Sequence, residues 1–234
     1  MLADDDAVEA VVFGPAGVLA SLPAGALHIS SSTISVGMAR RLAAKHAEAG
    51  QRFVSAPVFG RPDAAEAGRL FVIAAGNPSD IDRAAPVLDV FGQKRFYVSE
   101  RPETANVVKL SGNFLIASTI EALGEALALV DKSGVPQRTF IDIITSTLFD
   151  APVYRTYATL IAERRFEPAG FAAPLGYKDI RLALTAAEEI RVPMPLASLL
   201  RDRFLALMAQ GGDQLDWSAI GRLPAIDAGT AERP

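Results

Sequence analysis

Short apolar runs separated by amphipathic stretches fill the first hundred residues of the chain. Four runs have the length and composition of β-strands, at 26–30, 52–57, 70–75 and 94–98. Residues 35–48 and 79–91 instead repeat apolar side chains every three or four positions, as a helix with one buried face does. Pro86 is expected to break or kink the second helix. Strands that alternate with helices predict a largely parallel sheet with helices on its faces.

The rest of the chain carries only helical patterns. Residues 104–132 contain no proline and are apolar on nearly every side, which predicts one long helix buried on several sides. Further helices are expected at 137–147, 153–165, 177–190, 196–210 and 217–223. We therefore expect an α/β domain at 1–103, an all-α domain at 104–223 and a short tail at 224–234.

Glycine spacing excludes several familiar motifs. The chain has 18 glycines, and no two of them stand two, four or five positions apart. The sequence therefore contains none of three motifs: the dinucleotide-binding G-x-G-x-x-G, the phosphate-binding P-loop and the G-x-S-x-G nucleophile elbow.

Composition narrows the function classes further. Without cysteine there is no disulfide framework, thiolate zinc site or cysteine nucleophile, and two histidines leave little room for a metal site, so none is expected. A net charge of −4 argues against nucleic-acid binding. Residues 10–39 lack charges, but prolines interrupt them and no membrane span is expected. The acidic N-terminus lacks the basic region of a signal peptide, so we expect a cytoplasmic protein.

The long central helix holds the clearest chemical anomaly. Asn106, Lys109 and Asn113 stand at i, i+3 and i+7, on one face of an otherwise apolar helix. The spacing allows two interpretations. Lys109 could extend to solvent from the start of the helix, or it could donate and accept a proton while the Asn113 amide positions its amine.

Three loop segments carry further candidate residues. The turn at 55–61 follows a strand, where parallel sheets bind ligands, and Arg61 could bind an anion there; the alternative is a plain turn. Polar residues 30–33 suit either cofactor contacts or helix capping. Lys178 and Asp179 open a helix, where surface charge is the simpler explanation.

Together these segments resemble the β-hydroxyacid dehydrogenases, the family that contains 3-hydroxyisobutyrate dehydrogenase and 6-phosphogluconate dehydrogenase. The matching pieces are Met1-Leu2 before a helix and the segments 28–33, 55–60, 106–113 and 178–183. Each motif is moderately specific, but all five occur in the family's order and span the chain to about residue 220.

The resemblance implies hydride transfer between NAD or NADP and a small hydroxy acid or related carbonyl. In that assignment Lys109 is the general acid and base and Asn113 binds the substrate. The loop of Phe59, Gly60 and Arg61 meets the substrate's anionic end. Leu2, Thr33, Lys178 and Asp179 contact the cofactor, and the helical domain forms a homodimer.

Some residues depart from the family pattern. Phe59 stands where the family usually has serine, and Arg61 adds a guanidinium, so the substrate group is open. Gly112 replaces the first of two asparagines that usually follow the lysine. With these departures the chain also resembles the imine reductases, although Lys109 at the catalytic position favours the dehydrogenases.

The family begins with a strand, a G-x-G-x-x-G turn and a helix, and this sequence has no such turn. Compared with the family, roughly 60–70 residues are missing, through a late start or a deletion. We therefore expect an incomplete Rossmann-like parallel sheet of four strands, with an open edge at 26–30. Weak cofactor binding is expected, because the glycine-rich turn that seats the pyrophosphate is absent. The residues that select NAD or NADP are not in this sequence. The alternative function is a non-catalytic remnant that serves as a helical dimerisation module.

Overall fold

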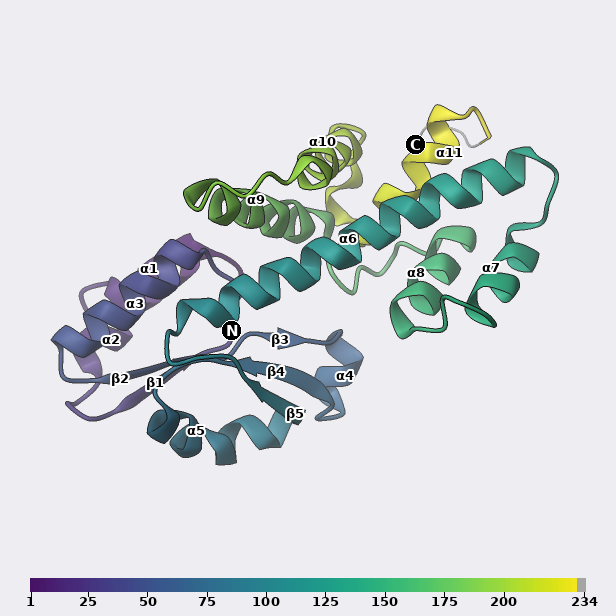
Figure 1. The fold of residues 1–234 in the computed structure, drawn as a ribbon. Coiled ribbons are helices and arrows are strands. Elements are labelled where there is room, and N and C mark those ends of the chain that lie inside the picture. Colours follow the sequence, from purple (N-terminus) through teal and green to yellow (C-terminus); the bar gives the residue numbers. More distant parts are fainter. Residues whose placement is uncertain (231–234) are drawn as a thin grey trace. The chain divides into compact units, whose positions relative to one another are not determined.

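The computed structural model describes residues 1–230, which form two compact units. The first unit comprises Met1–Gly112 and Thr185–Ile190, and the second comprises Asn113–Leu184 and the chain from Arg191 onward. Two helices, α6 (Glu103–Lys132) and α9 (Ala173–Glu189), contribute residues to both units (Figure 1).

Five strands lie in the described part of the first unit. They are β1 (Leu27–Ser30), β2 (Arg52–Ser55), β3 (Val58–Phe59), β4 (Leu70–Ala74) and β5 (Gly92–Tyr97). β1 pairs with β2 and β4 with β5, both in parallel, and a bridge between Ser55 and Ala75 connects the two groups. The four expected strands and the mainly parallel pairing are confirmed within a few residues. No described strand pairs with the side of β1 away from β2.

The expectation of four strands was wrong by one, because β3 escapes the pattern. β3 has only two residues and pairs antiparallel with β4, with Phe59 opposite Phe71. Two residues directly after Pro57 are too few to show the alternation that identifies a strand. This strand nevertheless fixes the backbone that carries Phe59.

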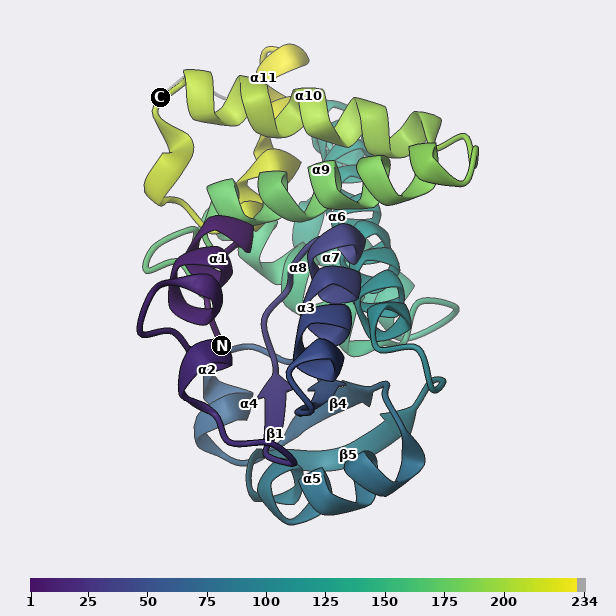
Figure 2. The same ribbon diagram turned by 90° about the vertical axis from the view of Figure 1, so that its left-hand side faces the viewer.

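Helices cover both faces of the sheet in the first unit (Figure 1 and Figure 2). Helices α1 and α3 lie on one side and α5 on the other. The helices of this unit outside α6 and α9 are α1 (Asp5–Phe13), α2 (Val18–Ser21), α3 (Val36–Glu48), α4 (Pro62–Glu66) and α5 (Pro78–Phe91). Ser35 caps α3 by accepting a hydrogen bond from the Met38 amide at 2.9 Å. Helix α5 continues through Pro86, so a break there is wrong, whereas the alternative of a kink stays a prediction.

Two histidines lie in the core of the first unit and bond to each other. Nε2 of Gln51 donates to the carbonyls of Leu19 and Leu22 at 2.9 and 2.7 Å, which leaves its Oε1 to accept from Nδ1 of His46 at 2.6 Å. Nε2 of His46 is then the acceptor for Nδ1 of His28, 2.8 Å away. This chain of bonds requires the His46 imidazole to be neutral, because its Nε2 accepts; Nδ1 of His28 donates in either protonation state.

Acid is therefore expected to destabilise the first unit. Burial, followed by the charges of His46 and the N-terminal amine, lowers the pKa of His28 from 6.5 to about 4. Between these values the unfolded chain binds a proton that the folded chain does not, so stability falls as the pH drops from 6.5 toward 4, by about 3 kcal/mol at most. Urea unfolding across this range measures the loss. His28→Gln can still donate to His46 and should flatten the pH dependence; identical slopes would contradict the assignment.

The second unit is helical in its described part. Besides its share of α6 and α9 it contains α7 (Gln137–Thr145), α8 (Pro152–Ala162), α10 (Pro195–Ala209), the 3-10 helices η1 (Gly212–Gln214) and η2 (Trp217–Arg222), and α11 (Leu223–Asp227). Its core includes Ile120, Leu200 and Phe204, all fully buried. Trp217 is also buried, and its indole Nε1 donates to the Tyr157 hydroxyl at 3.1 Å.

Two details of this unit differ from expectation. The helix expected at 217–223 is mainly 3-10, because its backbone bonds join residues three apart, as from the Ala219 amide to the Asp216 carbonyl at 2.9 Å. The segment expected as a tail begins inside α11, and Pro224 and Ile226 are buried there. The last four residues of that segment lie outside the described residues.

Among the described residues, α6 alone is long and apolar enough to cross a membrane by composition. Of its most apolar stretch 44% is buried inside the protein, and the core helix of a soluble protein has the same composition. Leu115 and Leu129 remain 63% and 69% exposed on it, so the expected burial on several sides is only partial.

Candidate active site

The first turns of α6 are fixed to the carboxyl ends of two strands by one buried side chain. Nδ2 of Asn106 donates to Oγ of Ser55, the last residue of β2, at 2.8 Å. Its Oδ1 accepts from the amide of Ile34, in the loop after β1, at 3.4 Å. Asn106 is fully buried, so its amide is held by protein groups alone. The orientation of α6, and of Lys109 one turn later, follows from these bonds.

Lys109 faces an aromatic ring. Its Nζ lies 4.5 Å from the centre of the Phe59 ring, within the range of a cation–π contact. Phe59 reaches this place because β3 pairs with β4 and its ring packs against the buried cluster of Ile73, Ala75 and Ala105. The structure thus brings together Lys109 and Phe59, two predicted site residues that are far apart in the sequence.

The other two residues of the predicted substrate loop follow directly. Gly60 has a φ of +139°, which a side chain would strain. Arg61 precedes α4, and its carbonyl accepts from the amides of Ala64 and Ala65 at 3.0 and 3.1 Å. The backbone of the turn is therefore fixed by a strand on one side and a helix on the other.

Two predicted cofactor contacts also lie close together in the first unit. The Leu2 amide donates to Oγ of Ser32 at 2.7 Å, and Ser32 is the neighbour of Thr33 in the loop after β1. This bond ties the start of the chain to the carboxyl end of β1, the edge where parallel sheets bind ligands. The cofactor roles of Leu2 and Thr33 stay predictions.

In the second unit a buried carboxylate connects three predicted site residues. Asp179 is 1% exposed, and its Oδ2 accepts from Nδ2 of Asn113 at 2.5 Å. Nζ of Lys178 lies 3.1 Å from its Oδ1. Asp179 therefore orients the Asn113 amide. The sequence predicted that Asn113 binds the substrate and Asp179 the cofactor. The hydrogen bond shows that these two side chains are direct neighbours.

Ser55, Asn106 and Ser32 hold the predicted residues in place. Sequence reasoning assigned no role to Ser55 or Asn106, and it considered Ser32 only as part of residues 30–33, for cofactor contacts or helix capping. A signal existed for Asn106, because an amide on an apolar helix face must find partners once it is buried. Its partners could not be named from the sequence, since hydroxyl groups at strand ends and in loops are common.

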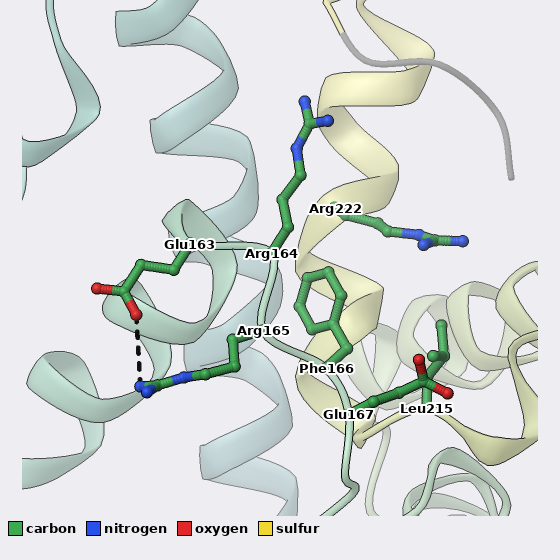
Figure 3. A pocket seen from close by; sticks show the side chains of 7 residues that line it. All are labelled: Glu163, Arg164, Arg165, Phe166, Glu167, Leu215 and Arg222. Carbon is green, nitrogen blue, oxygen red and sulfur yellow. Dashed lines mark ion pairs between the residues drawn. The ribbon is translucent and has the colours of Figure 1, made fainter.

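A separate pocket of about 510 Å³ lies in the second unit (Figure 3). It is lined by Glu163, Arg164, Arg165, Phe166, Glu167, Leu215 and Arg222. Glu163 pairs with Arg165 at 3.4 Å, and burial, followed by the charge of Arg164, lowers the pKa of Arg222. None of the predicted site residues lines this pocket, so we do not assign the reaction to it. In the described part of the chain, no three His, Cys, Asp or Glu side chains are grouped as metal ligands.

The first unit holds polar groups at the edge where a parallel sheet binds ligands. Ser30 and Ser55 are buried at the carboxyl ends of β1 and β2, and Oγ of Ser32 accepts a hydrogen bond from the Leu2 amide. Hydroxyl groups and backbone amides are the kinds of donor and acceptor that a carboxamide and a ribose need.

Family comparisons cover nearly the whole chain. The family described as the NAD binding domain of 6-phosphogluconate dehydrogenase matches residues 1–99. The family described as NAD-binding of NADP-dependent 3-hydroxyisobutyrate dehydrogenase matches residues 104–223.

Individual relatives agree with these matches. An uncharacterised oxidoreductase of Bacillus subtilis, YfjR, is 47% identical over 94% of this chain and 77% of its own length. Glyoxylate/succinic semialdehyde reductase 1 of Arabidopsis thaliana is 32% identical over 94% of this chain and 75% of its own. The solved 3-hydroxyisobutyrate dehydrogenase of Mycobacterium tuberculosis, with L-serine, is 29% identical, with a TM-score of 0.84 over 95% of this chain and 77% of its own. The chain belongs to the 3-hydroxyisobutyrate dehydrogenase-like β-hydroxyacid dehydrogenases, a family of NAD(P)-dependent oxidoreductases.

Proposed function

We propose that this chain catalyses hydride transfer between NAD(P) and a small hydroxy acid or its carbonyl form, with Lys109 as general acid and base. The observation that supports this role most directly is the position of Lys109. Asn106 fixes its helix to the carboxyl ends of β1 and β2, and its amine faces a ring on the predicted substrate loop.

The proposed chemistry divides between the cofactor and the lysine. Bound NAD(P)H supplies the hydride to the carbonyl carbon. The ammonium of Lys109 donates its proton to the carbonyl oxygen, which gains negative charge as the hydride arrives. In the oxidative direction the neutral amine accepts the hydroxyl proton. A lysine suits both directions, since its amine carries a proton that it can release and take back.

The remaining roles are assigned around that step. Leu2 and Thr33 contact the nicotinamide half of NAD or NADP, in keeping with the bond between Leu2 and Ser32. Asn113 binds the substrate, and Asp179 holds its amide. Lys178 reaches the cofactor from the helical part of the chain.

Arg61 is proposed to bind the anionic end of the substrate. Arg61→Ala should raise KM for carboxylate substrates by about 10-fold and change kcat by less than about twofold, because a charge-assisted bond to a remote group contributes equally to the ground and transition states. Steady-state kinetics measure both constants. Arg69→Ala, which removes an exposed arginine just before β4, is the control. An unchanged KM in Arg61→Ala would remove Arg61 from the site.

A substrate panel with NADH and NADPH tests the reaction class. Turnover of hydroxy acids or their aldehydes supports the proposal. Turnover confined to cyclic imines would favour an imine reductase instead. If neither class is turned over, the chain is better described as a non-catalytic dimerisation module.

A homodimer through the helical part remains a proposal. Large apolar side chains of the second unit are exposed, among them Leu115, Leu129 and Leu148 at 63%, 69% and 90%. A homodimer interface formed over these side chains would remove them from water. Light scattering after size exclusion measures the oligomeric state. The division into a cofactor-binding part at 1–103 and a helical part at 104–223, and a cytoplasmic location, likewise stay proposals.

A further inference from the structure

The pocket of about 510 Å³ in the second unit contains two arginines without a counter-ion (Figure 3). Arg164 follows the end of α8, and Arg222 is the last residue of η2. Among the described residues, neither side chain has a hydrogen-bond or ion-pair partner. Nε and Nη2 of Arg222 are also buried from solvent. A positive charge in this state is costly, and an anion bound in the pocket would offset that cost.

The carboxylates of the pocket leave these two charges uncompensated. Glu163 pairs with Arg165 at 3.4 Å, and both side chains point away from Arg222 in Figure 3. Glu167 also lines the pocket, but no ion pair joins it to Arg222 or Arg164 in Figure 3. Burial, followed by the charge of Arg164, lowers the pKa of Arg222, so the two arginines repel each other. With two unpaired guanidinium groups and one unpaired carboxylate, the pocket keeps a net positive charge.

Arg164 occupies a backbone position that usually belongs to glycine. Its φ is +50°, in the left-handed region. Helix α8 ends there with two hydrogen bonds, from the Arg164 amide to the Ile161 carbonyl at 3.1 Å and from the Arg165 amide to the Leu160 carbonyl at 3.0 Å. Glycine would adopt this turn with less strain. The arginine therefore holds a less favourable conformation and adds a second positive charge to the pocket.

The shape of the pocket favours a phosphate group with an organic substituent. Arg164 and Arg222 come from different segments and point in different directions (Figure 3). A planar carboxylate is matched by one guanidinium fork, whereas the three terminal oxygens of a phosphate accept hydrogen bonds from two directions. The volume lies within the range of roughly 300–1,000 Å³ that small-molecule sites have. Phe166 and Leu215 on its wall offer apolar surface to the organic part.

We propose that Arg164 and Arg222 bind a phosphate monoester that carries a small apolar group, at a site separate from the residues of the proposed reaction. None of those residues lines the pocket. Binding neutralises the two guanidinium groups and therefore stabilises the second unit. The proposal does not depend on the hydride transfer assigned above, because binding is observed without turnover.

Phenyl phosphate is the probe, and phosphorus NMR titration of the full chain measures its Kd. Arg222→Met and Arg164→Gly should each raise this Kd by at least about 10-fold, the loss expected for one charge-assisted hydrogen bond. Two matched controls lie outside the pocket and should keep the affinity. Arg201→Met removes an exposed arginine that is paired with Asp202 at 2.9 Å. Arg191→Gly relieves the same type of backbone, with a φ of +59°.

Thermal unfolding without phosphate separates a binding role from a structural one. Arg222→Met removes an unpaired buried charge but keeps an aliphatic chain, so the melting temperature should rise by roughly 3 °C. Arg164→Gly and Arg191→Gly should each raise it by roughly 2 °C, because glycine suits the left-handed backbone. Arg201→Met should change it little. If Arg222→Met instead lowers the melting temperature together with the affinity, Arg222 is structural and the proposal is overturned.

Further probes define the ligand. If phenyl phosphate does not bind, or binds both pocket variants as tightly as the unmodified chain, the site is overturned. Tighter binding of succinate than of phenyl phosphate would overturn the choice of phosphate. Inorganic phosphate should bind more weakly than phenyl phosphate, and equal affinity would overturn the apolar group. Displacement of phenyl phosphate by NADPH would assign the two arginines to the cofactor and overturn a separate site. Absence of turnover in the substrate panel would contradict the hydride transfer alone.

Discussion

Lys109→Ala is expected to lower turnover by about 10²–10⁴-fold, the usual contribution of a positioned general acid or base. The methyl group of alanine cannot donate a proton to the carbonyl oxygen, whereas the bonds of Asn106 that fix α6 do not involve the lysine. Binding of NADH and NADPH should therefore change little. Steady-state kinetics and fluorescence titration of both cofactors measure the two effects.

Two further variants separate proton transfer from packing. Lys109→Arg keeps the positive charge near the Phe59 ring but cannot release a proton at neutral pH, so it should stay inactive. Lys94→Ala removes a second lysine of the first unit whose Nζ lies 4.7 Å from a ring, that of Phe96. This control should keep full turnover. Retained activity in Lys109→Ala or Lys109→Arg would show that another group moves the proton.

Asp179→Ala should lower the free energy of unfolding by about 3 kcal/mol and abolish most turnover. The substitution leaves a buried Asn113 amide and the Lys178 amine without their shared carboxylate, and removing one member of a buried polar pair is costly. Urea unfolding measures the loss. The control is Asp202→Ala, which removes an exposed carboxylate paired with Arg201 at 2.9 Å and should cost less than about 1 kcal/mol.

Asp179→Asn distinguishes positioning from stability. It keeps the shape of the side chain and an oxygen that can accept from Asn113, but it loses the charge that faces Lys178. We expect the fold to persist and kcat to fall about 10- to 100-fold, with KM changing less, because the Asn113 amide is less firmly oriented in the transition state. A rise in KM alone, with kcat intact, would assign Asp179 to ground-state binding instead.

The sequence determined most of the longer elements of this protein. Alternation and helical periodicity placed β1, β2, β4 and β5 and the long helix α6 within a few residues, because each buries a regular face. Motif order along the chain was enough to predict the family, which the comparisons confirm. The two-residue strand β3, the short helices α2, α4 and α11 and the 3-10 turns of η2 were missed, since all of them are too short to repeat a pattern.

Only the tertiary structure decided which residues touch. Asn106 was visible as a polar residue on an apolar face, but its partners are Ser55 at the end of β2 and Ile34 in the loop after β1, which meet when the parallel strands align. Phe59 and Gly112 looked like two unrelated departures from the family pattern. They are one contact, because the register of β3 on β4 places the ring where a side chain at 112 would stand. Periodicity records which face of an element is buried, whereas the identity of the neighbour depends on how distant elements pack.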